Sequence, residues 1–240
     1  MKLINTKTNQ LIFTAETSES LANAIRKYFN QILVLAVDEV EIAKNDSPLY
    51  DETIAHRIGL IPLKSKKNIT EKTQAELKLK VKQEGIIYAE ELKGDIEIVY
   101  GKIPLTVLTK DQELELTATA KAGKASQHSK FSPGILIYRN LVDIKVDKNC
   151  PKEILEICPK NILKQEKISE EDIIKCDMCE LCIETCKKQN KDYVKIIPTN
   201  ELIITVESFG QFKPEEIFKK SVETLKKDLS EFSKEISKIK

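Results

Sequence analysis

Hydrophobic and polar residues follow a helical period near the start of the chain and a period of two further along. Ser18 suits a helix N-cap, and the apolar side chains that follow it at helical spacing predict a helix over 18–32. These side chains are Leu21, Ile25, Tyr28 and Ile32. A β-rich run and several alternating segments predict strands. The strands are expected at 34–42, 75–82, 95–100, 113–120 and 202–208, with two short strands around a polar turn in 2–16.

Signals at helix ends predict two more helices. Asp51 suits the N-cap of a short helix that passes through Ile54 and Ile58 and stops at Gly59. Pro214 opens the last helix, because a proline in the first turn loses no needed N–H bond. The mixture of helices and sheet strands predicts an α+β fold.

The last helix carries an apolar stripe whose spacings alternate between four and three residues, a strict heptad pattern. Its members are Phe218, Val222, Leu225, Leu229, Phe232, Ile236 and Ile239. Such a stripe packs either on its own domain or against a partner as well. The helix would be about 40 Å long at 1.5 Å per residue, which is long for a terminal element and favours the partner. The predicted partner interface consists of Leu21, Ile25, Phe218, Val222, Leu225, Leu229 and Phe232.

Composition narrows the class of protein. The chain has 240 residues, of which 41% are hydrophobic and 32% charged, and its net charge is +1. A protein that binds DNA by itself usually has a marked basic excess, so any nucleic acid is expected to be held by other chains. No apolar run approaches the roughly 20 residues that span a bilayer. The sequence begins MKLINTKTNQ, without a signal-peptide core, so a cytoplasmic protein without a membrane partner is expected.

All six cysteines fall between Cys150 and Cys186. In a reducing cytosol, such clustering indicates metal binding rather than a disulfide scaffold. The last four cysteines form the run C-x2-C-x2-C-x3-C, which is the run of bacterial ferredoxins. Ligands at this spacing let a loop wrap three corners of an iron–sulfur cube, whereas zinc sites tend to use two separated pairs. The run therefore favours an iron–sulfur cluster over zinc and over inert thiols.

The first half of a ferredoxin repeat is degenerate in this chain. Cys158 and Pro159 fit the end of such a half, but the three earlier ligand positions hold Lys148, Pro151 and Ile154. One cluster is therefore predicted and a second is not. Because the fourth ligand crosses over from the other run, Cys158 is expected to complete the site.

The predicted cofactor is a single cluster, of the 4Fe-4S or the 3Fe-4S type, in a ferredoxin-like subdomain at 145–197. Its predicted ligands are Cys158, Cys176, Cys179 and Cys182. The pseudo-symmetry of the ferredoxin repeat brings the two leftover cysteines, Cys150 and Cys186, near one another. They are expected to be either a disulfide or two buried inert thiols.

Residues 23–65 resemble a known motif. They contain NAIR at 23–26, VDEVEI at 37–42, Asn45 with Ser47, and DE-x-x-AHR-x-GLIPL at 51–63. The segment ELTATAKAGKASQHSKFSPG at 115–134 resembles a second motif, with the pattern A-x-A followed by H-x-K-F-x-P. Both are motifs of the alpha-like subunits of DNA-directed RNA polymerase, in the form found in archaea and eukaryotes. The resemblance covers nearly the whole chain.

This resemblance implies an architecture. A dimerisation domain is made from both chain ends, 1–45 and 201–240, and an insert domain at 46–200 includes the ferredoxin-like subdomain. The implied partners are subunit L in a heterodimer, subunits N and P, and the large catalytic subunits, with DNA reached only through the complex. His56 is expected to have a structural hydrogen-bonding role, and Arg57 suits a bidentate contact to a carboxylate of this chain or of a partner.

The sequence is consistent with two classes of function. The first is a non-catalytic assembly subunit of the polymerase, since the sequence has no phosphate loop, paired magnesium carboxylates or catalytic triad. Nucleotidyl transfer would then belong to the complex. The alternative is a ferredoxin-like electron-transfer protein. The alpha-like segment favours the first, because a ferredoxin needs neither the additional sheet nor the heptad helix.

Overall fold

The structure is a computed structural model that describes residues 1–65, 69–164 and 168–239. Strands and helices are mixed along the whole chain, which confirms the predicted α+β class. The chain divides into two compact units, each built from separated segments. The first consists of 1–6, 12–22 and 137–205, and the second of 7–11, 23–136 and 206–240. The predicted domain bounds at residues 45 and 200 stay a prediction.

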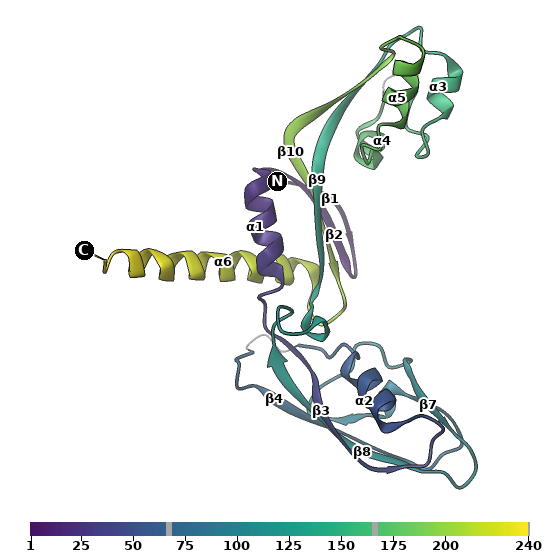
Figure 1. The fold of residues 1–240 in the computed structure, drawn as a ribbon, viewed down its shortest axis with the longest axis vertical. Coiled ribbons are helices and arrows are strands. Elements are labelled where there is room, and N and C mark those ends of the chain that lie inside the picture. Colours follow the sequence, from purple (N-terminus) through teal and green to yellow (C-terminus); the bar gives the residue numbers. More distant parts are fainter. Residues whose placement is uncertain (66–68, 165–167, 240) are drawn as a thin grey trace. The chain divides into compact units, whose positions relative to one another are not determined.

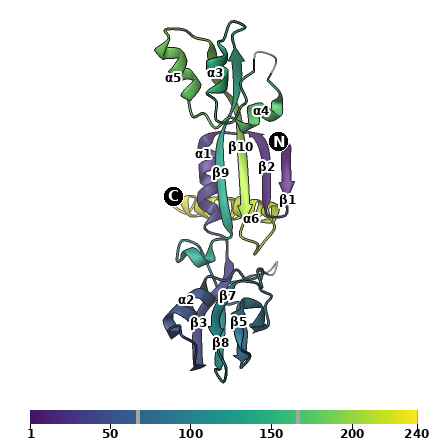
Figure 2. The same cartoon turned by 90° about the vertical axis from the view of Figure 1, so that its right-hand side faces the viewer.

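A four-stranded sheet supplies most of the first unit, in the order β1-β2-β10-β9 (Figure 2). Its strands are β1 (Lys2–Lys7), β2 (Gln10–Glu16), β10 (Val194–Ser208) and β9 (Gly134–Val146). The two N-terminal strands agree with the expectation for 2–16. Strand β10 contains the expected segment 202–208 and begins eight residues earlier, at Val194.

Three short helices lie between β9 and β10 in the chain and belong to the same unit (Figure 1). They are α3 (Lys152–Glu156), α4 (Glu170–Lys175) and α5 (Leu181–Lys188). Their core combines aliphatic side chains, such as Val142, Ile154 and Val194, with buried cysteines. Because so short a segment has few aliphatic side chains to bury, thiols make up a large part of its interior.

The second unit contains an antiparallel sheet in the order β3-β8-β4-β6 and a two-stranded sheet β5-β7. The strands are β3 (Val34–Asn45), β8 (Leu114–Gly123), β4 (Gln74–Val81), β6 (Lys93–Gly94), β5 (Gly85–Tyr88) and β7 (Pro104–Leu108). Two short 3-10 turns are η1 (Ala89–Glu91) and η2 (Ser129–Phe131). The strands expected at 34–42, 75–82 and 113–120 are thus present.

The strand expected at 95–100 is wrong. Beyond β6 this segment makes one isolated bridge, between Leu63 and Ile98. Its backbone pairs irregularly with a neighbouring loop: the N–H of Lys64 donates to Glu97, and the N–H of Val99 donates to Pro62. The alternating pattern therefore marked buried side chains, but the partner segment is too short for a ladder.

Helix α2 (Asp51–Gly59) buries Ile54 and Ile58 in the main core of this unit. Its N-cap is Tyr50, which caps no N–H with its side chain, so the expected capping role of Asp51 is wrong. The Asp51 carboxylate instead accepts a hydrogen bond of 2.7 Å from Nδ2 of Asn45. That amide fastens the loop before the helix.

Helices α1 (Glu19–Phe29) and α6 (Pro214–Ile236) complete the fold. Helix α1 ends at Phe29, and Ile32 is buried beyond its end, so the expected helix was three residues too long. Pro214 lies in the first turn of α6, as expected. None of the helices in the described ranges has the length and apolar character needed to cross a membrane.

Candidate partner surface and candidate metal centre

The N-terminal turns of α6 are fastened to the second unit. Ile217 and Ser221 are fully buried there. The ammonium of Lys220 lies 4.2 Å from the centre of the Phe212 ring, a cation–π contact. Burial raises the pKa of Tyr28 on α1, and a hydrogen bond to the Asp228 carboxylate on α6 raises it further. Tyr28 on α1 therefore lies near Asp228, beyond the first turns of α6.

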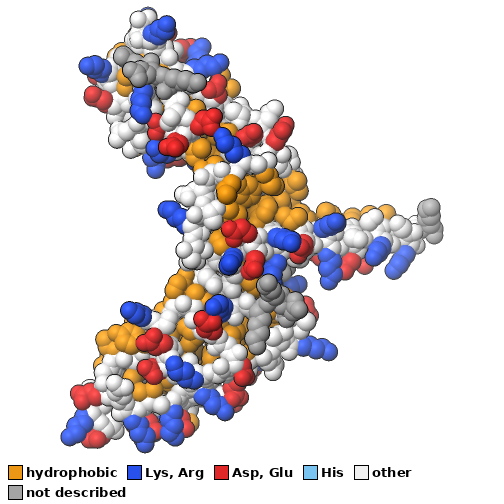
Figure 3. All heavy atoms as spheres, turned by 180° about the vertical axis from the view of Figure 1, so that it is seen from behind, with side chains coloured by type: hydrophobic (Ala, Val, Ile, Leu, Met, Phe, Trp, Pro, Cys, Tyr) orange, Lys and Arg blue, Asp and Glu red, His pale blue; other side chains and the backbone are white. Residues whose placement is uncertain are grey.

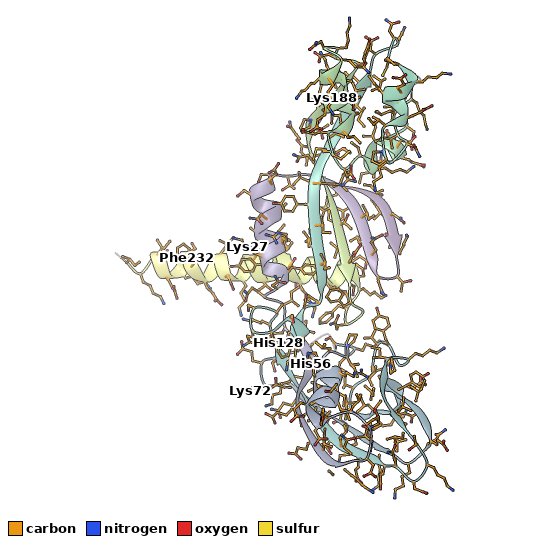
Figure 4. The ribbon with its side chains drawn as sticks, turned by 45° about the vertical axis from the view of Figure 1, so that its right-hand side comes forward. Lys27, His56, Lys72, His128, Lys188 and Phe232 are labelled. Carbon is orange, nitrogen blue, oxygen red and sulfur yellow. The ribbon has the colours of Figure 1, made fainter. Side chains whose placement is uncertain are left out.

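The apolar stripe of α6 loses its cover toward the C-terminus. Phe218 and Leu225 are partly buried, whereas Leu229 is 58% exposed and Phe232 is 61% exposed. Val222, Ile236 and Ile239 are exposed as well. Hydrophobic side chains line one side of the projecting helix in Figure 3, and the labelled Phe232 in Figure 4 has no other element beside it. The described part of this chain thus covers only the beginning of the stripe.

Two members of the predicted interface lie on α1. Ile25 is 9% exposed and packs inside the chain, while Leu21 is an exposed leucine. The backbone N–H of Leu21 donates to Oγ of Ser18, at 3.2 Å, so Ser18 caps the helix as expected. The assignment of Leu21 and Ile25 to an interface stays a prediction.

The six cysteines are thiols, and Cys179 alone among them is exposed. The chain turns sharply through the ferredoxin-like run, because Met178 (φ 55°) and Glu180 (φ 59°) both adopt the left-handed region. Cys176 is the C-cap residue that follows α4, and α5 begins after Glu180. The first part of the run, from Cys176 to Glu180, is therefore a loop between two helices, while Cys182 and Cys186 lie on α5.

The predicted ligands influence one another electrostatically. Burial raises the pKa of the Cys176 thiol, and nearby Asp177, Cys158 and Cys179 raise it further, while a backbone hydrogen bond from Met178 lowers it. Burial also raises the pKa of Cys182 to about 11, with Cys158 and Cys176 adding to the shift. Metal ligation requires thiolates, so binding at these cysteines must release protons.

Two observations bear on whether these cysteines could hold a metal group. Across residues 1–65, 69–164 and 168–239, no three His, Cys, Asp or Glu side chains are grouped so that they could hold a metal ion. The predicted ligands Cys158, Cys176, Cys179 and Cys182 are thus not drawn together onto one ion. Their donor chemistry, thiols with backbone N–H groups beside two of them, is nevertheless that of iron–sulfur ligation, in which the thiolates bind different irons of the cluster.

Cys150 and Cys186 are neighbours in the same buried core. Burial raises the pKa of Cys150, and Cys186 is the next largest cause of that shift. The Sγ of Cys150 donates to the carbonyl of Pro151 at 3.8 Å. The two thiols thus belong to one buried core, and both their pairing and the choice between a disulfide and inert thiols stay predictions.

Two charged residues near the cysteines, Arg139 and Asp172, were not among the residues predicted from the sequence. Arg139 on β9 donates from Nη1 to the carbonyl of Cys176 at 2.5 Å and from Nη2 to the carbonyl of Ile174. Asp172 accepts from Lys164 at 2.7 Å and from Lys175 at 2.9 Å. The contacts of Arg139 join segments that are far apart in the sequence, so no local pattern indicates them, whereas Asp172 and Lys175 are an i,i+3 pair within α4.

The polar residues of the two motifs differ in their contacts. Arg57 donates from Nη1 to the carbonyl of Leu105 at 2.8 Å and forms no ion pair with a carboxylate among the described residues, so the contact within the chain is wrong and the contact to a partner's carboxylate stays a prediction. His56 is exposed on α2 and is labelled in Figure 4, and its expected hydrogen-bonding role stays a prediction. In the second motif, Lys130 forms an ion pair of 2.7 Å with Asp38 and its N–H donates to Nδ1 of His128.

Comparison with known proteins agrees with this architecture. The family model described as the RNA polymerase Rpb3/RpoA insert domain matches residues 40–138. A DNA-directed RNA polymerase subunit Rpo3 from Pyrococcus furiosus is 32% identical, over 92% of this chain and 90% of the relative. The subunit Rpo3 of Methanobrevibacter smithii is 28% identical over 93% of each chain. A DNA-directed RNA polymerase II subunit rpb3 from Dictyostelium discoideum is 28% identical over 96% of this chain and 92% of its own length.

The chain therefore belongs to the alpha-like subunit family of DNA-directed RNA polymerases, in its archaeal and eukaryotic form. This confirms the resemblance carried by the two sequence motifs. Membership gives the chain a role in transcription as a subunit within the polymerase complex.

Proposed function

We propose that this chain is a non-catalytic assembly subunit of RNA polymerase that pairs through α6 with the small subunit L and holds one iron–sulfur cluster. The observation that carries the proposal is the uncovered heptad stripe of α6. The chain would also support subunits N and P and the large catalytic subunits, in which nucleotidyl transfer takes place. With a net charge of +1, it would meet DNA only through the complex.

The physical chemistry of α6 supports a helical partner. A helix that leaves the body of its unit lacks tertiary packing, and isolated helices are marginal in water. Burying a large apolar side chain contributes roughly 1.5–3 kcal/mol, so covering Leu229, Phe232 and Ile236 would stabilise the helix and the complex together. A strict heptad repeat is the pattern that a second helix packs against with its own apolar side chains.

The experiment is co-production of the chain with subunit L, followed by size-exclusion chromatography with light scattering. The double variant Leu229→Asp with Phe232→Asp changes only exposed side chains, so the monomer should still fold. We expect a one-to-one heterodimer for the wild type and none for this variant. Lys234→Asp, on the same helix outside the stripe, is the matched control and should pair normally. A monodisperse wild-type monomer that ignores subunit L would contradict the proposal.

For the cluster, the proposed ligands are Cys158, Cys176, Cys179 and Cys182. The group would supply folding energy to a small core and one-electron chemistry when bound. Cys158, Cys176 and Cys182 would hold it from the buried core, and Cys179 from the surface. Iron and acid-labile sulfide measured on anaerobically purified protein test this part. A purified protein that contains zinc, or no metal, would reject it.

A further inference from the structure

Arg139 lies on strand β9, 37 residues before Cys176, and reaches the end of helix α4 within the same unit. Both of its terminal nitrogens are used there: Nη1 donates to the carbonyl of Cys176 at 2.5 Å, and Nη2 donates to the carbonyl of Ile174. The planar guanidinium thus spans two carbonyls that flank Lys175. A lysine has a single ammonium and does not present this fork.

The two carbonyls need a donor from outside the helix. The last carbonyls of any helix have no partner in the next turn, and basic side chains near a helix C-terminus satisfy them. Here α4 ends at Lys175, and the N–H of Cys176 donates to Ile173. The fork of Arg139 therefore fixes the direction in which the chain leaves α4, and so the place of the Cys176 side chain.

The charge of Arg139 also lies beside the cysteine run. Partial burial lowers its pKa, and Cys176 and Asp177 oppose that effect. No carboxylate forms an ion pair with Arg139 in the parts of the chain that the structure describes. Within α4 itself, Asp172 is held by Lys164 and Lys175, so that helix has a second, independent anchor.

We propose that Arg139 is a positioning residue for the iron–sulfur site: its two hydrogen bonds set the Cys176 loop before the cluster binds, and its charge raises the reduction potential of the bound cluster. This inference rests on the cluster proposed above. The first effect follows from the fork at the end of α4. The second follows because a fixed positive charge stabilises the reduced, more negative cluster.

The experiment compares Arg139→Lys and Arg139→Gln in the full chain paired with subunit L. Lysine keeps the charge and loses the fork, whereas glutamine loses both. Lys145→Gln removes a positive charge from an exposed position on the same strand and is the matched control. The readouts are iron and sulfide per chain, the rate of cluster loss to a chelator, and the reduction potential from a titration followed by electron paramagnetic resonance.

We expect both Arg139 variants to lose the cluster about 10-fold faster than the wild type, as is typical when a residue that orients a ligand is removed. Only Arg139→Gln should lower the potential, and Lys145→Gln should change neither quantity. Wild-type lifetime and potential in Arg139→Gln would overturn the inference. A wild-type protein without iron and sulfide would instead reject the cluster itself, which is distinguishable because the control protein fails as well.

Discussion

The phenol of Tyr28 on α1 lies close enough to the carboxylate of Asp228 on α6 for that carboxylate to raise the pKa of the phenol. The two residues are about 200 positions apart in the sequence, and Asp228 lies in the second half of α6. Beyond this point the stripe side chains Leu229 and Phe232 are exposed. The pair therefore marks the boundary between the part of α6 that the chain holds and the part offered to a partner.

Tyr28→Phe should lower the free energy of unfolding by at most about 1 kcal/mol, because it removes the interaction of the phenol with the Asp228 carboxylate at a position that solvent partly screens. Because the folded-state pKa of Tyr28 is raised, its contribution is present below the ordinary value of 10.0 and is lost as the pH rises through the folded pKa. Urea unfolding at pH 7 and above pH 10 measures both effects. The exposed Tyr50→Phe is the control and should change neither.

Lys130→Met tests the second sequence motif. Lys130 lowers the pKa of Asp38 through an ion pair of 2.7 Å, so the pair stabilises the fold above the ordinary carboxyl value of 3.8 and loses its effect as the pH falls below it. Asp38 is partly exposed, so screening limits the expected loss to about 1 kcal/mol at pH 7. The difference between variant and wild type should shrink at pH 3, and a difference that persists unchanged would argue against the pair.

Gly134→Ala should destabilise the chain by more than the usual cost of a glycine substitution. Gly134 has φ 156°, and an added Cβ would overlap the carbonyl oxygen of Glu207 on β10. Gly85 has φ 126° with open space around it, so Gly85→Ala carries the backbone strain without the clash. We expect a loss of roughly 1–3 kcal/mol for Gly85→Ala and a larger one for Gly134→Ala, measured by thermal unfolding. Equal losses would contradict this role of the glycine.

Cys179→Ser tests whether the cluster stabilises the small core at 145–197. Its side chain is exposed, so the substitution removes little packing of its own. If the cluster supplies folding energy, the variant should become sensitive to protease in this segment while the second unit stays resistant. Equal resistance in the cluster-loaded wild type and the variant would count against a structural role of the cluster.

The sequence predicted elements best where local pattern and packing agree. The heptad stripe identified α6, and the alternation at 113–120 identified β8, because side-chain period follows backbone geometry. The pattern at 95–100 misled, since alternation there reflects burial of side chains against an irregular loop rather than a ladder. The predicted N-cap of α2 was wrong by one residue, because Tyr50 holds that position and the carboxylate of Asp51 accepts from the amide of Asn45 instead.

The same rule holds for the candidate site: a local sequence pattern can be recognised, whereas a contact between distant segments cannot. Cysteine spacing alone identified the run at 176–186, because ligand spacing is a local property. No sequence pattern indicates the contacts of Arg139 to Ile174 and Cys176, since they depend on how β9 and α4 are placed within the fold. The exposure of Leu229 and Phe232 likewise required the structure, because a heptad pattern does not say whether its own chain covers it.

Hydrogen–deuterium exchange of α6, with and without subunit L, tests the central claim most directly. In the chain alone, amides from about residue 226 onward should exchange rapidly, because that part of the helix lacks tertiary packing. On pairing with subunit L, the same amides should be protected at least about 100-fold, as expected for a helix whose apolar face becomes buried. A heterodimer that forms while α6 exchanges at its original rate would contradict the account.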